Sequence, residues 1–171
     1  MIISLIFRRA ITSATALLCV VGLAAAQSAR VDRLEILNAG FYTSHVTGQV
    51  KNSGSPTGTE ITEEKVTFLK GAPANAASVG TIFGVQARLF GQPENANVVL
   101  REVWNLPAPG TTDPKTGNNY RQVTFNFTAR IGSVQTRGYG FDNSWEVLRG
   151  VWTQEIWQGD RKLLERSYTI P

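Results

Sequence analysis

The chain has 171 residues, of which 42% are hydrophobic and 18% charged, and its formal net charge is +4. Its Lys and Arg residues are scattered rather than clustered, which excludes the charge footprint of a nucleic-acid-binding protein. Cys19 and His45 are the single cysteine and the single histidine, which excludes sites built from several histidines. A Ser-His-Asp hydrolase would have to use His45, and the sequence has no G-x-S-x-G turn for the nucleophile.

The N-terminal segment has the layout of a secretory signal peptide. Arg8 and Arg9 precede an apolar run, residues 10–22, and the small residues 24–26 follow it. We therefore predict a signal peptide over residues 1–26, cleavage near Ala26/Gln27, and a periplasmic or secreted mature protein.

Three other interpretations of this segment are weaker. An uncleaved membrane anchor would need about 20 apolar residues. A lipoprotein would need a small residue before Cys19, which instead follows two leucines. A twin-arginine signal would have Ser or Thr where Phe7 stands. We expect no stable membrane insertion after cleavage.

Cleavage would change the net charge of the chain and the side chains available for catalysis or metal binding. Loss of Arg8 and Arg9 leaves 15 basic against 13 acidic residues, a net charge of +2. The only cysteine and the only methionine are also lost, so disulfides and thiolate sites are excluded.

Residues 27–171 suffice for one domain that buries roughly 68% of its unfolded surface. We expect a monomer without cofactor or metal. The aromatic candidates for its core are Trp104, Trp145, Trp152, Trp157, Phe125, Phe127 and Tyr168.

Period-two alternation dominates the mature chain and predicts strands. The clearest case is Gln122–Ile131, where apolar and polar residues alternate without interruption. The predicted strands are Val31–Leu37, Ile61–Leu69, Thr81–Phe90, Val98–Leu106, Gln122–Ile131, Val151–Trp157 and Lys162–Ile170. Seven or eight short strands with such turns between them indicate an all-β, antiparallel, immunoglobulin-like sandwich.

The C-terminal segment predicts a β-hairpin. Gly159-Asp160 suits a tight turn, which would place Gln158 opposite Arg161 and Ile156 opposite Leu163. Before the hairpin, Asn143 or Ser144 can cap one short helical turn over residues 145–148, which Gly150 ends.

The long polar loop Pro107–Tyr120 is the first candidate for a ligand or partner site, because long loops in compact domains tend to be functional or mobile. Its candidate residues are Thr111, Thr112, Asp113, Lys115, Asn118, Asn119 and Tyr120. Calcium would need six or more oxygens, and the loop offers a single carboxylate. The same residues also suit plain turn formation.

Trp145 and Trp157 are candidate stacking residues. An exposed Trp beside an amide such as Asn143, Gln154 or Gln158 would suit a sugar or a peptide. The alternation places Trp152 on one face of its strand and Trp157 on the other, so an outward Trp is expected.

The carboxylates offer little for catalysis. Glu63 and Glu64 are adjacent on a predicted strand and point to opposite faces. Asp142 and Glu146 flank the short helical turn, where negative charge at a helix N-terminus is favourable. They remain the candidates for a carboxylate-dependent hydrolase.

Three segments together resemble a bacterial family known as domain of unknown function 3859. They are Gly80–Val85, Trp104–Pro107 with the following Pro109-Gly110 and Thr116-Gly117, and Gly138–Asp142 continuing through Trp145, Glu146, Gly150, Trp152 and Ile156. The resemblance spans about Val66 to Tyr168. It implies an exported or surface domain of uncharacterised role and brings no catalytic residue with it.

The sequence therefore leaves several functions open. The first is a non-catalytic exported module that binds an envelope protein, a polymer or a small molecule through its end loops, or that is structural. The alternatives are the hydrolase with Asp142 or Glu146, and a carbohydrate- or peptide-binding module with an exposed Trp. A pilus-type chaperone is a weaker possibility, because such proteins have two domains.

Overall fold

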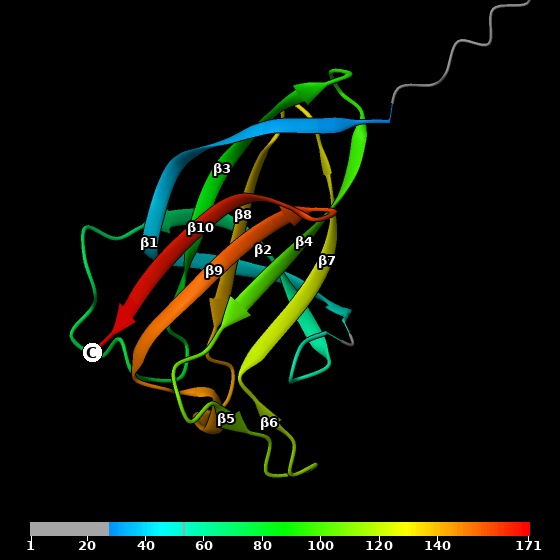
Figure 1. The fold of residues 1–171 in the computed structure, drawn as a ribbon. Helices are drawn as coiled ribbons and strands as arrows, with labels where there is room; N and C mark the ends of the chain where they lie inside the picture. The colour runs from blue at the N-terminus through cyan, green and yellow to red at the C-terminus, as the bar shows by residue number, and fades with distance from the viewer. Residues whose placement is uncertain (1–27, 53) are drawn as a thin grey trace, which may run out of the picture.

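The computed structural model describes residues 28–52 and 54–171, so the predicted signal peptide lies outside the described residues. Two four-stranded antiparallel sheets pack face to face (Figure 1). The first sheet has the order β2 (Thr59–Phe68), β1 (Arg30–Lys51), β3 (Ile82–Gln92), β8 (Val134–Gly140). The second has the order β10 (Arg161–Ile170), β9 (Gly150–Gln158), β4 (Asn97–Asn105), β7 (Gln122–Arg130).

The connections between the sheets confirm the predicted immunoglobulin-like sandwich. The chain changes sheet between β3 and β4, between β7 and β8, and again between β8 and β9. Because β8 returns to pair with β3 and β9 returns to pair with β4, the strands interleave as a Greek key. Among the described residues, no helix is long and apolar enough to span a membrane.

Aromatic side chains from both sheets form the centre of the core. Phe83 of β3 packs edge-on against Trp104 of β4, with ring centroids 5.4 Å apart, and against Trp152 of β9 at 5.6 Å. The three side chains are fully buried. Of the aromatic residues predicted for the core, Trp104, Trp152, Phe125 and Tyr168 are buried, whereas Trp145, Trp157 and Phe127 are only half-buried.

Two strands differ from the sequence prediction: β1 is longer than predicted, and β8 was not predicted. The strand predicted over Val31–Leu37 continues to Lys51, because β-bulges between Ile36 and Asn38 and at two later points break the alternation. β8 was missed altogether, because its inward-facing positions include Arg137 and its other face carries two glycines.

The C-terminal hairpin forms as predicted, with one correction of register. Arg161 lies opposite Gln158, but Ile156 pairs with Leu164 instead of Leu163, because a β-bulge follows Lys162. The predicted helical turn is a single 3-10 turn over Ser144–Glu146, shorter than expected, since β9 already begins at Gly150.

The distal half of β1 and all of β2 form an arm that lies across one side of the sandwich. Residues 43–52 and 54–68 are called the β1–β2 arm below. In Figure 1 this teal segment passes behind β8 and β4. Its tip packs on β7 so closely that a Cβ on Gly54 would lie 2.0 Å from the carbonyl oxygen of Thr124. The arm therefore begins in the first sheet, passes the free edge of β8 and reaches the second sheet.

Candidate binding groove between β2 and β8

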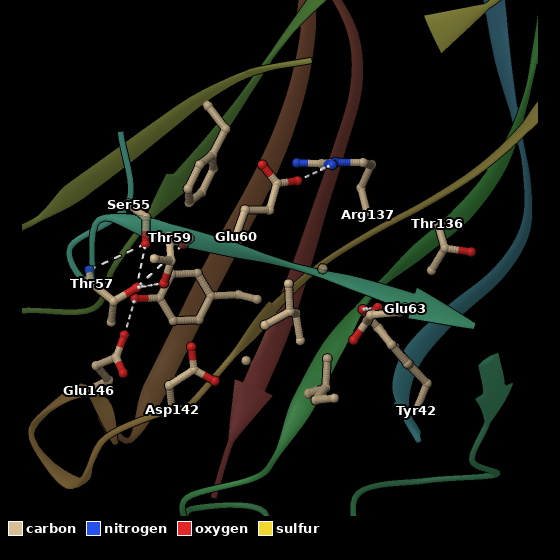
Figure 2. Close-up of a pocket in the computed structure, with 16 residues that line it drawn as sticks. Tyr42, Ser55, Thr57, Thr59, Glu60, Glu63, Thr136, Arg137, Asp142 and Glu146 are labelled. Carbon is tan, nitrogen blue, oxygen red and sulfur yellow. Dashed lines mark hydrogen bonds and ion pairs between the residues drawn. The ribbon is translucent and has the colours of Figure 1, made fainter. Parts of the chain in front are cut away.

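The β1–β2 arm and the edge of β8 enclose a groove, called the β2–β8 groove below. It consists of a deep hollow of about 90 Å³ and an adjoining, more open hollow of about 430 Å³. The two hollows share Glu60, Ile61, Glu63, Thr136 and Arg137. Figure 2 shows the crossing of β2 and β8, with Glu60, Glu63, Thr136 and Arg137 labelled around it.

Arg137 of β8 is the anchor at the inner end of the groove. Its guanidinium donates to the Glu102 carboxylate of β4, with Nη2 2.7 Å and Nε 2.9 Å from Oε2. Nη1 lies 2.5 Å from Glu60 Oε1 of the arm, and the guanidinium carbon lies 4.4 Å from the centroid of the Phe127 ring. Burial by itself lowers the pKa of this guanidinium, and the two carboxylates raise it by more, so Arg137 stays charged.

Glu102 is fully buried, and two core side chains donate hydrogen bonds to it besides Arg137. The indole N–H of Trp104 donates to Glu102 Oε1 at 3.0 Å, and the amide of Gln154 donates to the same oxygen at 2.7 Å. The hydroxyl of Tyr168 in turn donates to Gln154 Oε1 at 2.8 Å. A buried charge is tolerated when it is paired and hydrogen-bonded in this way. The network therefore fixes Arg137, and through it the arm.

Two further carboxylates of the groove hold the structure around them. Glu63 on the arm accepts hydrogen bonds from the Tyr42 hydroxyl at 2.9 Å and the Ser44 hydroxyl at 2.7 Å. Glu146 accepts from the backbone N–H of Asn143 at 2.8 Å, from its side-chain amide at 3.0 Å, and from the Tyr139 hydroxyl at 3.3 Å. Burial raises the pKa of Glu146, and its bonds to Asn143 oppose that shift.

Asp142 completes the acidic lining at the deep end of the groove. Burial raises the pKa of Asp142, and repulsion from Glu63 raises it further. The groove is therefore lined by four carboxylates, those of Glu60, Glu63, Asp142 and Glu146. The cation that faces them, Arg137, already shares its charge with the buried Glu102.

The arrangement suits recognition of a positive group rather than capture of a metal ion. Within residues 28–52 and 54–171, His, Cys, Asp and Glu side chains form no group of three or more that could hold a metal ion. Such a site would need several converging oxygens, whereas Glu63 and Glu146 are already hydrogen-bonded to their neighbours.

The loop predicted as the first candidate site is a small hairpin at one end of the sandwich. β5 (Thr111–Thr112) pairs with β6 (Asn119–Tyr120). Asp113 closes its turn: its carboxylate accepts from the Lys115 backbone N–H at 2.8 Å and from the Thr116 hydroxyl at 2.9 Å. These bonds hold the pKa of Asp113 below its usual range, that of Lys115 having the largest effect.

The hairpin and one of the candidate tryptophans meet at this end. The Thr111 hydroxyl donates to the carbonyl oxygen of Trp145, and Thr111 is buried. The amide of Asn143, expected beside Trp145 as a ligand-binding group, instead donates to Glu146.

Trp157 lies elsewhere, on the outer face of the second sheet. The Arg101 guanidinium and the Lys162 ammonium lie 5.5 Å and 5.0 Å from the centroid of its ring, and its indole N–H donates to Glu155 at 2.8 Å. The amides expected beside it are engaged elsewhere. Gln154 is buried with Glu102, and Gln158 bonds the backbone of Ala29 and Val31 at 2.9 Å.

Sequence reasoning named Asp142 and Glu146, set Glu63 aside with Glu64, and missed Glu60, Glu102 and Arg137. Glu102 lies in the middle of an alternating strand, and Arg137 lies in a segment without alternation. An inward-facing Glu in a predicted strand was the one available signal, because a buried charge requires a partner.

Comparisons with known proteins add a structural likeness. No protein-family model and no curated protein matches the sequence. A solved structure of an immunoglobulin-like protein from Pseudomonas aeruginosa matches with a TM-score of 0.49 and 23% sequence identity. The match covers 86% of this chain and 99% of that one.

Proposed function

We propose that this protein is an exported, non-catalytic binding module whose β2–β8 groove captures a positively charged segment of a protein partner in the cell envelope. The observation that carries the proposal is the acidic lining of a groove in an otherwise basic chain. Export rests on the signal-peptide layout of residues 1–26, and the resemblance to domain of unknown function 3859 remains a prediction in accord with it.

The charge distribution supports a basic ligand. Four of the 13 acidic residues line the groove, and a fifth, Glu102, neutralises Arg137 behind it. With these five and Arg137 set aside, the sequence from Gln27 onward retains 14 basic and eight acidic residues. A basic segment is therefore attracted to the groove and repelled by much of the remaining surface, which gives specificity as well as steering.

The geometry of the carboxylates supports binding over catalysis. Glu146 accepts three hydrogen bonds that hold the 3-10 turn in place, so most of its acceptor capacity is committed to the fold. The carboxylate-hydrolase alternative keeps one supporting observation, the raised pKa of both Asp142 and Glu146. Activity on envelope substrates that disappears in Asp142→Asn would favour that alternative.

A second candidate surface lies at the end of the sandwich that carries β5 and β6. The contact between Thr111 and Trp145 brings two sequence-predicted candidates together, so a recognition surface for a polymer or a small molecule can form there. Substitution of Thr112, Lys115 and Asn118 by Ala leaves Asp113 and Thr111 in place, and loss of ligand binding in that variant would assign the site to this surface.

The test of the proposed function uses two synthetic peptides and isothermal titration calorimetry. One alternates lysine and valine over nine residues, and the other alternates glutamate and valine. We expect the lysine peptide to bind and the glutamate peptide not to bind. The Asp142→Asn/Glu63→Gln double variant should weaken binding about tenfold or more, because it removes two charges and keeps hydrogen-bond acceptors.

The control for this test is Glu165→Gln, since Glu165 is an exposed glutamate on β10. It should bind like the wild type. Equal binding of both peptides, no binding of either, or full affinity in the double variant would each contradict the proposed function.

A further inference from the structure

β8 leaves one edge of the first sheet without a strand partner. It pairs with β3 on one side and is the last strand of the sheet among the described residues. Just beyond β8, the backbone N–H of Phe141 donates to the carbonyl oxygen of Thr81 on the β3 side at 3.0 Å. In an antiparallel ladder the bonding direction alternates, so the backbone groups of Thr136, Gly138 and Gly140 point away from β3 and toward the free edge.

This edge is recessed instead of open to solvent. Thr136, Gly138 and Gly140 are half-buried, and all three line the deep hollow under the β1–β2 arm. Natural sheets usually block an edge with charges, proline or a covering element, and backbone groups removed from water are normally hydrogen-bonded. Here the arm is the covering element, and it leaves the deep hollow of about 90 Å³ beside the edge, which adjoins the more open hollow of about 430 Å³.

We propose that the partner's basic segment binds as an extended strand that adds to the free edge of β8 beneath the β1–β2 arm. This inference rests on the proposed function and specifies its mode of binding. Main-chain hydrogen bonds to Thr136, Gly138 and Gly140 provide the affinity, and the side chains of the added strand provide the specificity.

The walls of the groove define the chemistry of the added strand. Glu63 and Asp142 face basic side chains, while Ile61, Val66 and the partly exposed Val134 offer apolar contacts along the same groove. Successive side chains of a strand alternate in direction, so a segment that alternates basic and small apolar residues matches both kinds of wall. The seven residues of β8 provide an edge roughly 23 Å long.

Gly140 allows a sharp test of the pairing. Gly140→Pro removes the edge-facing N–H and leaves the bonds to β3 intact, because proline is tolerated on the outer side of an edge strand. Gly140→Ala keeps that N–H, and its Cβ fits, since the nearest atom, in the Ile82 side chain, lies 3.7 Å away. We expect the alanine variant to bind the lysine–valine peptide like the wild type and the proline variant to bind about tenfold more weakly.

A second measurement covers the case in which Gly140→Pro fails to fold. Wild-type protein is titrated with the same peptide carrying N-methyl groups on alternate residues, once in each of the two registers. One register should abolish binding and the other should preserve it, because only one edge of the added strand faces β8. Hydrogen exchange followed by NMR should show new protection of the Gly138 and Gly140 amides in the complex.

The outcomes separate this inference from the proposed function. Binding of the lysine–valine peptide that depends on Glu63 and Asp142, but is equal in Gly140→Pro and in both N-methylated peptides, would overturn strand addition and leave the proposed function standing. Absence of peptide binding would overturn both. Protection of the same amides in the free protein at high concentration, together with dimers in sedimentation, would assign the edge to a second copy of this chain and overturn the inference.

Discussion

Two clusters of charged side chains, each formed by one cation and two carboxylates, differ mainly in burial. At the β2–β8 groove, Arg137 joins Glu102 at 2.7 Å, and these side chains are 15% and 0% exposed. On the outer face of the second sheet, Lys162 joins Glu165 at 2.5 Å, and these side chains are 35% and 55% exposed. Similar distances thus have different consequences, because water screens the outer pair and is excluded from the inner one.

The two clusters therefore have different structural roles. The inner cluster uses Arg137 to join β8, β4 and the arm, so its loss affects three elements at once. The outer cluster covers the indole of Trp157, and its ion pairs join only the two strands of a hairpin. Burial, and not the number of ion pairs, decides which cluster the fold depends on.

The largest expected effect is that of Glu102→Ala. It leaves the buried charge of Arg137 without its main partner and the N–H groups of Trp104 and Gln154 without an acceptor. We expect the free energy of unfolding to fall by about 3–5 kcal/mol in urea denaturation. The control is Glu165→Ala on the outer face. A loss below about 1 kcal/mol for Glu102→Ala would show that the inner cluster is no stronger than a surface pair.

A smaller effect of opposite sign is expected for Asp142→Asn. Because the pKa of Asp142 is raised above its ordinary value of 3.8, folding disfavours the charged carboxylate. The stability that protonated Asp142 contributes is present below pH 3.8 and is lost as the pH rises through the folded-state pKa.

The asparagine variant should therefore be more stable than the wild type at neutral pH, by about 0.5 kcal/mol for this partly exposed group. The difference should vanish in acid, and urea denaturation at both pH values measures it. Asp160→Asn, at the exposed hairpin turn, is the control. Destabilisation by Asp142→Asn at neutral pH would contradict the cost assigned to burying its charge and to repulsion from Glu63.

The smallest effect is expected for Lys162→Met. Its ion pairs with Glu155 and Glu165 lie at the surface, and methionine preserves contact with the Trp157 ring. The thermal midpoint should match that of the wild type at low and at high salt. A loss comparable to that of Glu102→Ala would remove the distinction between the two clusters.

Much of the fold followed from local patterns. The alternation of Gln122–Ile131 and of the two C-terminal strands predicted β7, β9 and β10, and Gly159-Asp160 predicted the hairpin turn. The capped turn before β9 also formed, with Asn143 and Glu146 as partners. These elements are predictable because the side chains that specify them lie within a few residues of one another.

The candidate groove could not be predicted in the same way. Glu60, Glu102 and Arg137 come from three strands that are far apart in the sequence, and each looks like an ordinary polar residue of a strand. β8 shows no alternation, because its inward-facing Arg137 is stabilised by partners in other strands. Likewise, the register of β10 depended on a bulge that no residue type near Lys162 signals.

By itself, the sequence determined the all-β class, the antiparallel sandwich and the strands whose two faces differ in polarity, because burial of one face imposes a period of two on the residues. Only the tertiary structure decided where β1 bends, how the arm crosses β8 and which charges share the β2–β8 groove. These features depend on contacts between distant strands, whose energy is set by burial and partner geometry and not by the identity of neighbouring residues.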